Sequence, residues 1–121
     1  MAVHCIEKKT EAELRKITDE VVKRILENTP LRVNKIILYG SYARGDAEDG
    51  SDIDIMVLCD NNKEEANKHF KEIFEIADRV AFENDIMIQT NVENESFFNN
   101  WIDDLPYYKN VKNEGVLLYG E

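Results

Sequence analysis

The segment Leu38-Tyr39-Gly40-Ser41-Tyr42-Ala43-Arg44-Gly45, followed by Ser51-Asp52-Ile53-Asp54-Ile55, decides the fold of this chain. The stretch from Val33 to Tyr39 is rich in β-branched and aromatic side chains, which predicts a buried strand. A polar, glycine-flanked loop over 45–51 leads into a second predicted strand, Asp52 to Leu58. The unit is therefore a strand, a turn, a loop and a second strand.

Helical periodicity surrounds this unit. Thr10 and Glu13 have the spacing of a capping box, and the apolar residues that follow recur at helical spacing as far as Pro30. The other expected elements are a helix from Asn62 through Val80, a strand over Asp85–Thr90, a helix over Glu93–Asp104, a turn or short helix at Pro106 and a strand over Val116–Tyr119. This order predicts an α/β (α+β) fold, with helices packed on a small mixed β-sheet, in a single domain over 1–121.

Composition narrows the classes of function. The chain has 25 acidic and 15 basic residues, and its net charge of −10 repels phosphate backbones, so we do not expect it to bind nucleic acid nonspecifically. No apolar run reaches the roughly 20 residues of a membrane-spanning helix, and residues 1–7 lack a signal-peptide layout, which predicts a cytoplasmic protein without a membrane partner. Cys5 and Cys59 lack zinc-ligand spacing, and Cys59 is expected in the core.

Asp52 and Asp54 stand two residues apart in the second predicted strand, so both side chains should leave the same face of the sheet. Two like charges this close repel one another unless a cation lies between them. Carboxylate oxygens suit Mg²⁺, and two carboxylates hold a pair of ions about 3.5–4 Å apart in phosphoryl-transfer enzymes. A solvated strand edge that carries an acidic pair is the plain structural alternative.

Gly40-Ser41 closes the strand that we expect beside the Asp52–Asp54 strand. Glycine lets the backbone approach a ligand closely, and Ser41 at the start of a helical turn presents its N–H and hydroxyl to a phosphate. An ordinary strand-ending turn is the structural alternative. Arg44 has two interpretations, contact with a phosphate or an ion pair with Asp46, Glu48 or Asp49.

Gly40-Ser41, ten intervening residues and Asp52-x-Asp54 resemble the signature of the DNA polymerase β-like nucleotidyltransferase superfamily. The fuller string, with Arg44-Gly45 and Ser51, resembles the minimal nucleotidyltransferases, or MNT domains, and the resemblance extends from the first helix to Tyr119. It implies an enzyme that moves a nucleoside monophosphate, expected to be AMP from ATP, onto a hydroxyl and releases pyrophosphate. It also implies nucleotide contacts at Gly40, Ser41, Arg44 and Ser51.

The resemblance further implies a third carboxylate on a neighbouring strand. Asp85 is the best match, with Glu83 as the alternative and Glu93 as a more distant one. The family pattern places an apolar residue before this acid, whereas Asn84 stands there in this chain. On this interpretation Asp52, Asp54 and Asp85 form a catalytic site for two Mg²⁺ ions, with Mn²⁺ as a substitute, and Asp85 helps to deprotonate the acceptor hydroxyl.

The residues leave the acceptor open. MNT proteins are commonly encoded beside a HEPN-domain ribonuclease toxin, and some act as antitoxins by transferring AMP to a tyrosine of that partner. The resemblance therefore implies a toxin–antitoxin pair, in which a HEPN-domain partner or a homo-oligomer completes the acceptor site. A small-molecule transferase similar to the aminoglycoside nucleotidyltransferases is the second interpretation, although those enzymes generally carry an added helical domain. A non-catalytic partner-binding module is the third, and the presence of all the expected groups favours an enzyme over it.

Overall fold

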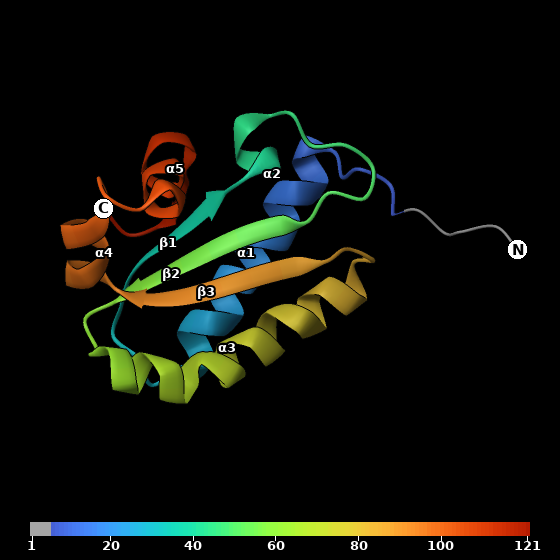
Figure 1. Ribbon diagram of the computed structural model, residues 1–121. Coiled ribbons are helices and arrows are strands. Elements are labelled where there is room, and N and C mark those ends of the chain that lie inside the picture. The colour runs from blue at the N-terminus through green and yellow to red at the C-terminus, as the bar shows by residue number, and fades with distance from the viewer. Residues whose placement is uncertain (1–5) are drawn as a thin grey trace, which may run out of the picture.

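The computed structural model describes residues 6–121 and contains one four-stranded mixed sheet (Figure 1). Its elements in chain order are α1 (Glu11–Asn28), β1 (Val33–Tyr39), α2 (Ser41–Arg44), β2 (Ile53–Cys59), α3 (Lys63–Glu83), β3 (Ile88–Asn94), α4 (Glu95–Trp101), α5 (Pro106–Glu114) and β4 (Val116–Tyr119). The strands lie in the order β3-β2-β1-β4. β1 is antiparallel to β2 and β4, and β2 is parallel to β3. The mixed α/β architecture expected from the sequence is confirmed.

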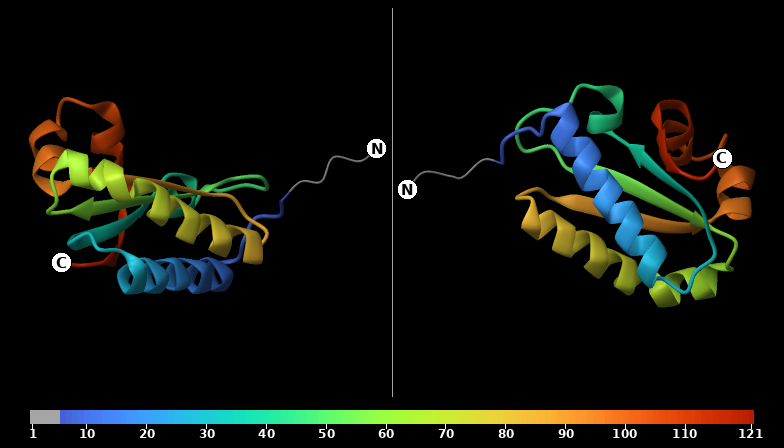
Figure 2. Two further views of the ribbon diagram at one scale, coloured as in Figure 1. Left: turned by 90° about the horizontal axis from the view of Figure 1, so that it is seen from below. Right: turned by 180° about the vertical axis from the view of Figure 1, so that it is seen from behind.

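The two faces of the sheet are covered differently. α1 and α3 lie side by side over one face, where they bury the main hydrophobic core (Figure 2). α4 and α5 lie on the opposite face, where Phe98, Tyr108 and Val111 pack on Tyr39 and Met56. This second cluster occupies only part of its face, so one end of the sheet is left for a site.

Local signals place the starts of α1 and α3 correctly. Thr10 accepts a hydrogen bond from the Glu13 N–H at 3.1 Å and its own N–H donates to Glu13 Oε1 at 2.9 Å, which is the expected capping box. Asn62 caps α3 by accepting from the Glu65 N–H. The side chain of Cys59 is buried, as expected, and Cys5 lies outside the described residues.

The third strand is the main correction to the sequence-based expectation. The strand begins at Ile88 and not at Asp85, because α3 continues to Glu83 and the chain then turns through Asp85, whose φ is 51°. It also continues to Asn94, because its parallel ladder with β2 runs on until Asn94 pairs with Cys59. The expected helix over 93–104 therefore starts later, at Glu95, with Asn94 as its cap.

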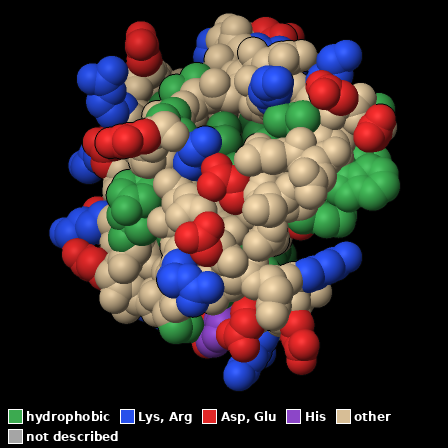
Figure 3. Space-filling model, turned by 90° about the vertical axis from the view of Figure 1, so that its left-hand side faces the viewer, with side chains coloured by type: hydrophobic (Ala, Val, Ile, Leu, Met, Phe, Trp, Pro, Cys, Tyr) green, Lys and Arg blue, Asp and Glu red, His purple; other side chains and the backbone are tan. Residues whose placement is uncertain are grey.

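Some large apolar side chains of the helices remain on the surface. Phe70 and Phe74 of α3 are 37% and 44% exposed, because the apolar stripe of this helix is wider than the surface it covers. On the face drawn in Figure 3, acidic and basic side chains are interspersed, so the surplus of negative charge is not gathered there in one patch. Within residues 6–121, no helix combines the length and the apolar character that a membrane crossing requires.

Candidate functional site

Asp52 and Asp54 lie at the start of β2, on the face that α1 and α3 do not cover. Ile53 and Ile55, the residues that alternate with them, are fully buried in the core under those helices. Asp54 therefore points to the opposite face, as its spacing predicts. Its partner in the β1–β2 ladder is Tyr39, the last residue before the glycine turn. The antiparallel pairing brings the two segments of the decisive motif side by side.

Gly40 is in direct contact with the carboxylate of Asp54. Its φ of 79° lies in the left-handed region, and a Cβ at this position would overlap Oδ2 of Asp54 and stand 3.2 Å from its Cγ. Both the backbone conformation and the close approach therefore require glycine. The turn that follows and the carboxylate pair belong to one site.

The turn itself is the short helix α2, which begins at Ser41. The N–H groups of Arg44 and Gly45 donate to the Gly40 and Ser41 carbonyl oxygens, each at 3.0 Å. The first N–H groups of a helix have no acceptor within the helix, so those of Ser41 and Tyr42 are available to a phosphate oxygen. A helical turn therefore starts at Ser41, which is the arrangement that would let Ser41 meet a phosphate.

The carboxyl group of Asp54 has an unusual acidity. Burial, as the larger cause, and the negative charge of Asp52 together raise its pKa to about 6, while Arg44 opposes the shift. The charged form of Asp54 is thus disfavoured in the metal-free protein. A divalent cation at this position would remove the repulsion and favour the ionised carboxylate.

Gln89 is the residue of the site that sequence reasoning missed. It pairs with Asp54 in the β2–β3 ladder, and its Nε2 donates to Oδ2 of Asp52 at 2.8 Å. Its neighbours Ile88 and Thr90 are buried on the other face, so Gln89 lies on the same face as the two acids. The alternation of apolar and exposed residues over 86–89 was visible in the sequence and is the signal that could have identified it.

The candidates for a third carboxylate lie apart from this pair. Asp85 lies in the turn before β3, Glu83 is at the end of α3 with an ion pair to Arg24 at 2.8 Å, and Glu93 pairs with Leu58 near the far end of β2. Among residues 6–121, no group of three or more His, Cys, Asp or Glu side chains is arranged to hold a metal ion. The structure therefore brings Asp52 and Asp54 together but does not add Asp85 to them as a third ligand.

Two carboxylates beside the start of the α2 turn nevertheless fit a Mg²⁺ site. Mg²⁺ is commonly bound through one or two protein carboxylates, and substrate phosphates and water complete its octahedral shell. Asp52 and Asp54 supply such oxygens, and the amide of Gln89 holds one of them in place. The donor set suits a metal that arrives with a triphosphate.

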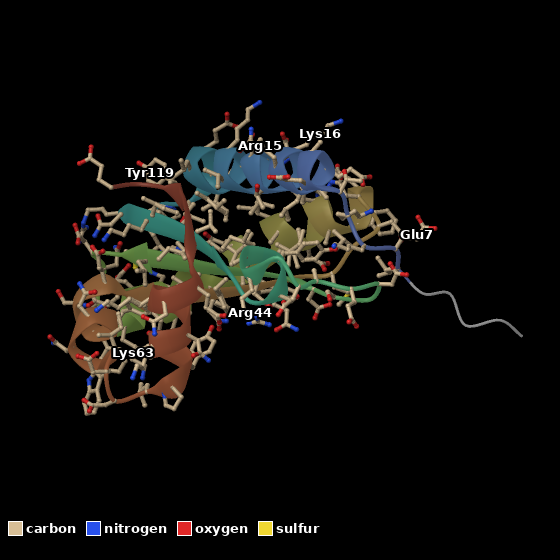
Figure 4. The ribbon with its side chains drawn as sticks, turned by 90° about the horizontal axis from the view of Figure 1, so that it is seen from above. Glu7, Arg15, Lys16, Arg44, Lys63 and Tyr119 are labelled. Atoms are coloured by element: carbon tan, nitrogen blue, oxygen red, sulfur yellow. The ribbon has the colours of Figure 1, made fainter. Side chains whose placement is uncertain are left out.

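Arg44 and Ser51 are both engaged within the protein. Arg44 forms an ion pair with Asp46 at 3.2 Å, which is one of the partners expected from the sequence. It forms a second ion pair with Glu114 of α5 at 3.0 Å, a residue far away in the chain. Figure 4 places Arg44 on the opposite side of the sheet from Arg15 and Lys16 of α1. The Ser51 hydroxyl accepts from the Glu48 N–H at 2.9 Å and so helps to hold the loop between the motif halves.

Comparison with known proteins agrees with this geometry. Residues 14–115 match the family model described as "Nucleotidyltransferase domain". Two Methanocaldococcus jannaschii proteins are similar in sequence. "Putative protein adenylyltransferase MJ0604" is 36% identical over 91 residues, which cover 73% of this chain and 80% of that protein. "Putative protein adenylyltransferase MJ0141" is 30% identical over 96 residues, which cover 79% of this chain and 95% of that protein.

Solved structures show the same fold. A crystal structure described as a toxin-antitoxin with AMP-PNP superposes with a TM-score of 0.58 at 22% identity, over 86% of this chain and 73% of that one. A mutant of the toxin-antitoxin MntA-HpeT superposes with a TM-score of 0.57 at 20% identity, over the same shares of the two chains. These neighbours have the polymerase β-like nucleotidyltransferase fold. With its motif halves joined at Gly40 and Asp54, this chain belongs to the nucleotidyltransferase domain family and is a nucleotidyltransferase.

Proposed function

We propose that the protein transfers AMP from ATP, in the presence of Mg²⁺, to a hydroxyl of a protein partner. The observation that carries this proposal is the contact between Gly40 and the Asp54 carboxylate, because it joins a phosphate-facing turn to a pair of metal-ligating acids. The names of the M. jannaschii relatives support AMP as the transferred group and a protein as its acceptor.

Each part of the site has a role in this reaction. The α2 turn, with the Gly40 backbone and Ser41, would hold the outer phosphates, and Asp52 and Asp54 would hold Mg²⁺, or Mn²⁺, next to the α-phosphate. A bound ion supplies charge neutralisation at the reacting phosphate. The acceptor oxygen forms a bond to the α-phosphorus, the bond from that phosphorus to the oxygen bridging to the β-phosphate breaks, pyrophosphate leaves, and the hydroxyl proton passes to solvent.

The chain's own contribution is positioning. Gln89 holds Asp52 through the 2.8 Å hydrogen bond, and Gly40 permits the close approach of Asp54 to the turn. Positioning and charge neutralisation account for most of the catalysis in phosphoryl transfer. Asp85, in the turn before β3, is the candidate that we retain for a third acidic group, to be tested by substitution.

The partner in this proposal is a HEPN-domain toxin, and the protein is its antitoxin. The structural likeness to the MntA-HpeT toxin-antitoxin supports this setting. α4 and α5 cover only part of the face around Asp54, with no further helical domain over it among residues 6–121, which suits a large acceptor that brings its own surface.

The test is a labelling reaction with the purified protein, Mg²⁺, α-labelled ATP and the protein encoded beside it. We expect label on a tyrosine, serine or threonine of the neighbour, and no label with Asp54→Asn. The Asp103→Asn variant, in the loop after α4, is a matched control with the same change of charge and should remain active. Label on an aminoglycoside or on tRNA alone would refute the protein acceptor, and ATP binding without any transfer would favour a binding module.

A further inference from the structure

Two tyrosines and an asparagine form a hydroxyl cluster beside Asp54, defined here as Tyr39, Tyr107 and Asn91. Tyr39 belongs to β1 and Asn91 to β3, with β2 between them, yet Asn91 Nδ2 donates to the Tyr39 hydroxyl at 3.1 Å. The Tyr39 side chain therefore crosses over β2. Tyr107 reaches the same point from α5, where Asn91 Nδ2 also donates to its hydroxyl at 2.8 Å.

A count of hydrogen atoms shows that the cluster has a donor left over. The two hydrogens of Asn91 Nδ2 go to the two tyrosine hydroxyls, and one hydroxyl donates to the other. The hydroxyl that receives both bonds keeps its own hydrogen, and no acceptor for it is present among the described residues. The Asn91 Oδ1 atom likewise accepts no hydrogen bond from a described residue. The cluster thus offers one donor and one acceptor to a bound molecule.

The cluster stays in its donor form at neutral pH. Burial is the first cause that raises the pKa of both tyrosines, and the negative charge of Asp54 contributes in the same direction. Tyr39 is only 8% exposed, whereas Tyr107 is 41% exposed, so a molecule in solution can reach the hydroxyl pair from the Tyr107 side.

The position of the cluster indicates which part of a nucleotide it would meet. The α2 turn and Asp52 lie at one end of the site, Asp54 is in the middle, and Asn91 lies two residues beyond Gln89 along β3, a step of about 7 Å. A triphosphate on the turn places its α-phosphate at Asp54. The group attached to that phosphate, the sugar, then extends towards the cluster, to which α5 contributes Tyr107.

We propose that Tyr39, Tyr107 and Asn91 form the subsite for the sugar of the bound nucleoside triphosphate, with the free hydroxyl hydrogen donated to a ribose hydroxyl and Asn91 Oδ1 accepting from it. A ribose hydroxyl both donates and accepts, which matches the pair of groups that the cluster leaves free. This inference rests on the proposed function, because it takes the triphosphate to bind between the α2 turn and Asp54.

The test compares ATP with 2′-deoxy-ATP and 3′-deoxy-ATP by calorimetry, with Mg²⁺ and without an acceptor. The variants are Tyr107→Phe and the double variant Tyr39→Phe/Tyr107→Phe. Tyr108→Phe is the control, because it removes a neighbouring hydroxyl of α5 that lies towards Glu93 and not in the cluster. For wild type, we expect removal of one of the two sugar hydroxyls to weaken binding about fivefold, which is typical of one hydrogen bond.

The double variant should bind ATP about fivefold more weakly than wild type and should distinguish ATP from the deoxynucleotide less well, because only the contact of Asn91 Oδ1 with the ribose hydroxyl remains. Tyr108→Phe should behave as wild type. Tyr107→Phe should show the same loss of discrimination in part. If the double variant instead loses as much affinity as wild type does when ATP is replaced by the deoxynucleotide, the cluster does not touch the sugar. In that case the inference is wrong, although the proposed function stands. If wild-type protein binds no ATP at all, both are wrong.

Discussion

Replacing Asp54 by asparagine should raise the melting temperature of the metal-free protein while it removes activity. The wild-type carboxylate is held against the Gly40 backbone and beside Asp52, and its pKa is raised from 3.8 to about 6. A carboxyl group whose pKa is raised by folding does not lower the free energy of unfolding below pH 3.8, where it is protonated in both states. The destabilisation grows as the pH rises from 3.8 to about 6 and is complete above that pH. Asparagine keeps the shape of the side chain and has no charge to bury.

The magnitude follows from that shift in pKa. At about 1.36 kcal/mol for each tenfold change in acidity, a pKa raised from 3.8 to about 6 corresponds to about 3 kcal/mol. Asp54 is only half-buried, and solvent screening lowers the expected gain in the free energy of unfolding to about 1–2 kcal/mol. For a chain of 121 residues this corresponds to a rise in Tm of about 4–8 °C.

The assay is thermal unfolding of wild type, Asp54→Asn and the control Asp103→Asn at pH 8 and pH 4.5, with a chelator present. At pH 8 the Tm should rise in Asp54→Asn and not in Asp103→Asn. This rise in Tm should be much smaller at pH 4.5, where wild-type Asp54 is largely protonated in the folded state. Adding Mg²⁺ and a non-hydrolysable ATP analogue should then stabilise wild type more than Asp54→Asn. A lower Tm for Asp54→Asn at pH 8, or an equal gain at both pH values, would refute the electrostatic reasoning.

Three further changes test the geometry of the site. Gly40→Ala should weaken Mg²⁺–ATP binding at least tenfold by displacing Asp54, whereas Gly45→Ala, at a similar φ of 85° but with open space for its Cβ, should only lower the Tm. Asp85→Asn should weaken metal binding, measured by calorimetry, far less than Asp54→Asn, and equal losses would make Asp85 a third ligand. Gln89→Glu should tighten Mg²⁺ binding and lower the metal-free Tm, because it adds a third negative charge beside Asp52 and Asp54. If the Mg²⁺ affinity and the Tm both stay unchanged, Gln89 does not face the two acids.

Much of the fold could be predicted because its signals are local. The bounds of β1 and β4 are those expected, the capping residues of α1 and α3 lie at the expected positions, and Pro106 opens α5. A helix cap, an amphipathic helical pattern and a strand-ending glycine each depend on residues that are close together in the chain. The elements that they define can therefore be predicted from a short stretch of sequence. The spacing of Asp52 and Asp54 is a signal of the same kind, since alternation in a strand decides which face both occupy.

The identity of the residue beside the acidic pair was beyond local reasoning. Taking Asp85 as a strand residue was natural from the apolar run that follows it, but the length of α3 and the parallel register with β2 place Gln89 opposite Asp54. A shift of a few residues in that register would exchange one neighbour for another, and nothing within the segment itself reports the register.

The sequence by itself determined that this is a nucleotidyltransferase with a glycine turn and a carboxylate pair, because both halves of that motif lie within one strand–turn–strand unit. Only the tertiary structure decided what surrounds the pair: Gln89, which bonds to Asp52, and the Tyr39–Tyr107–Asn91 cluster next to Asp54. These contacts join residues as far as 68 positions apart in the chain. They depend on strand order, register and the packing of α5, which are properties of the whole core and not of any short segment.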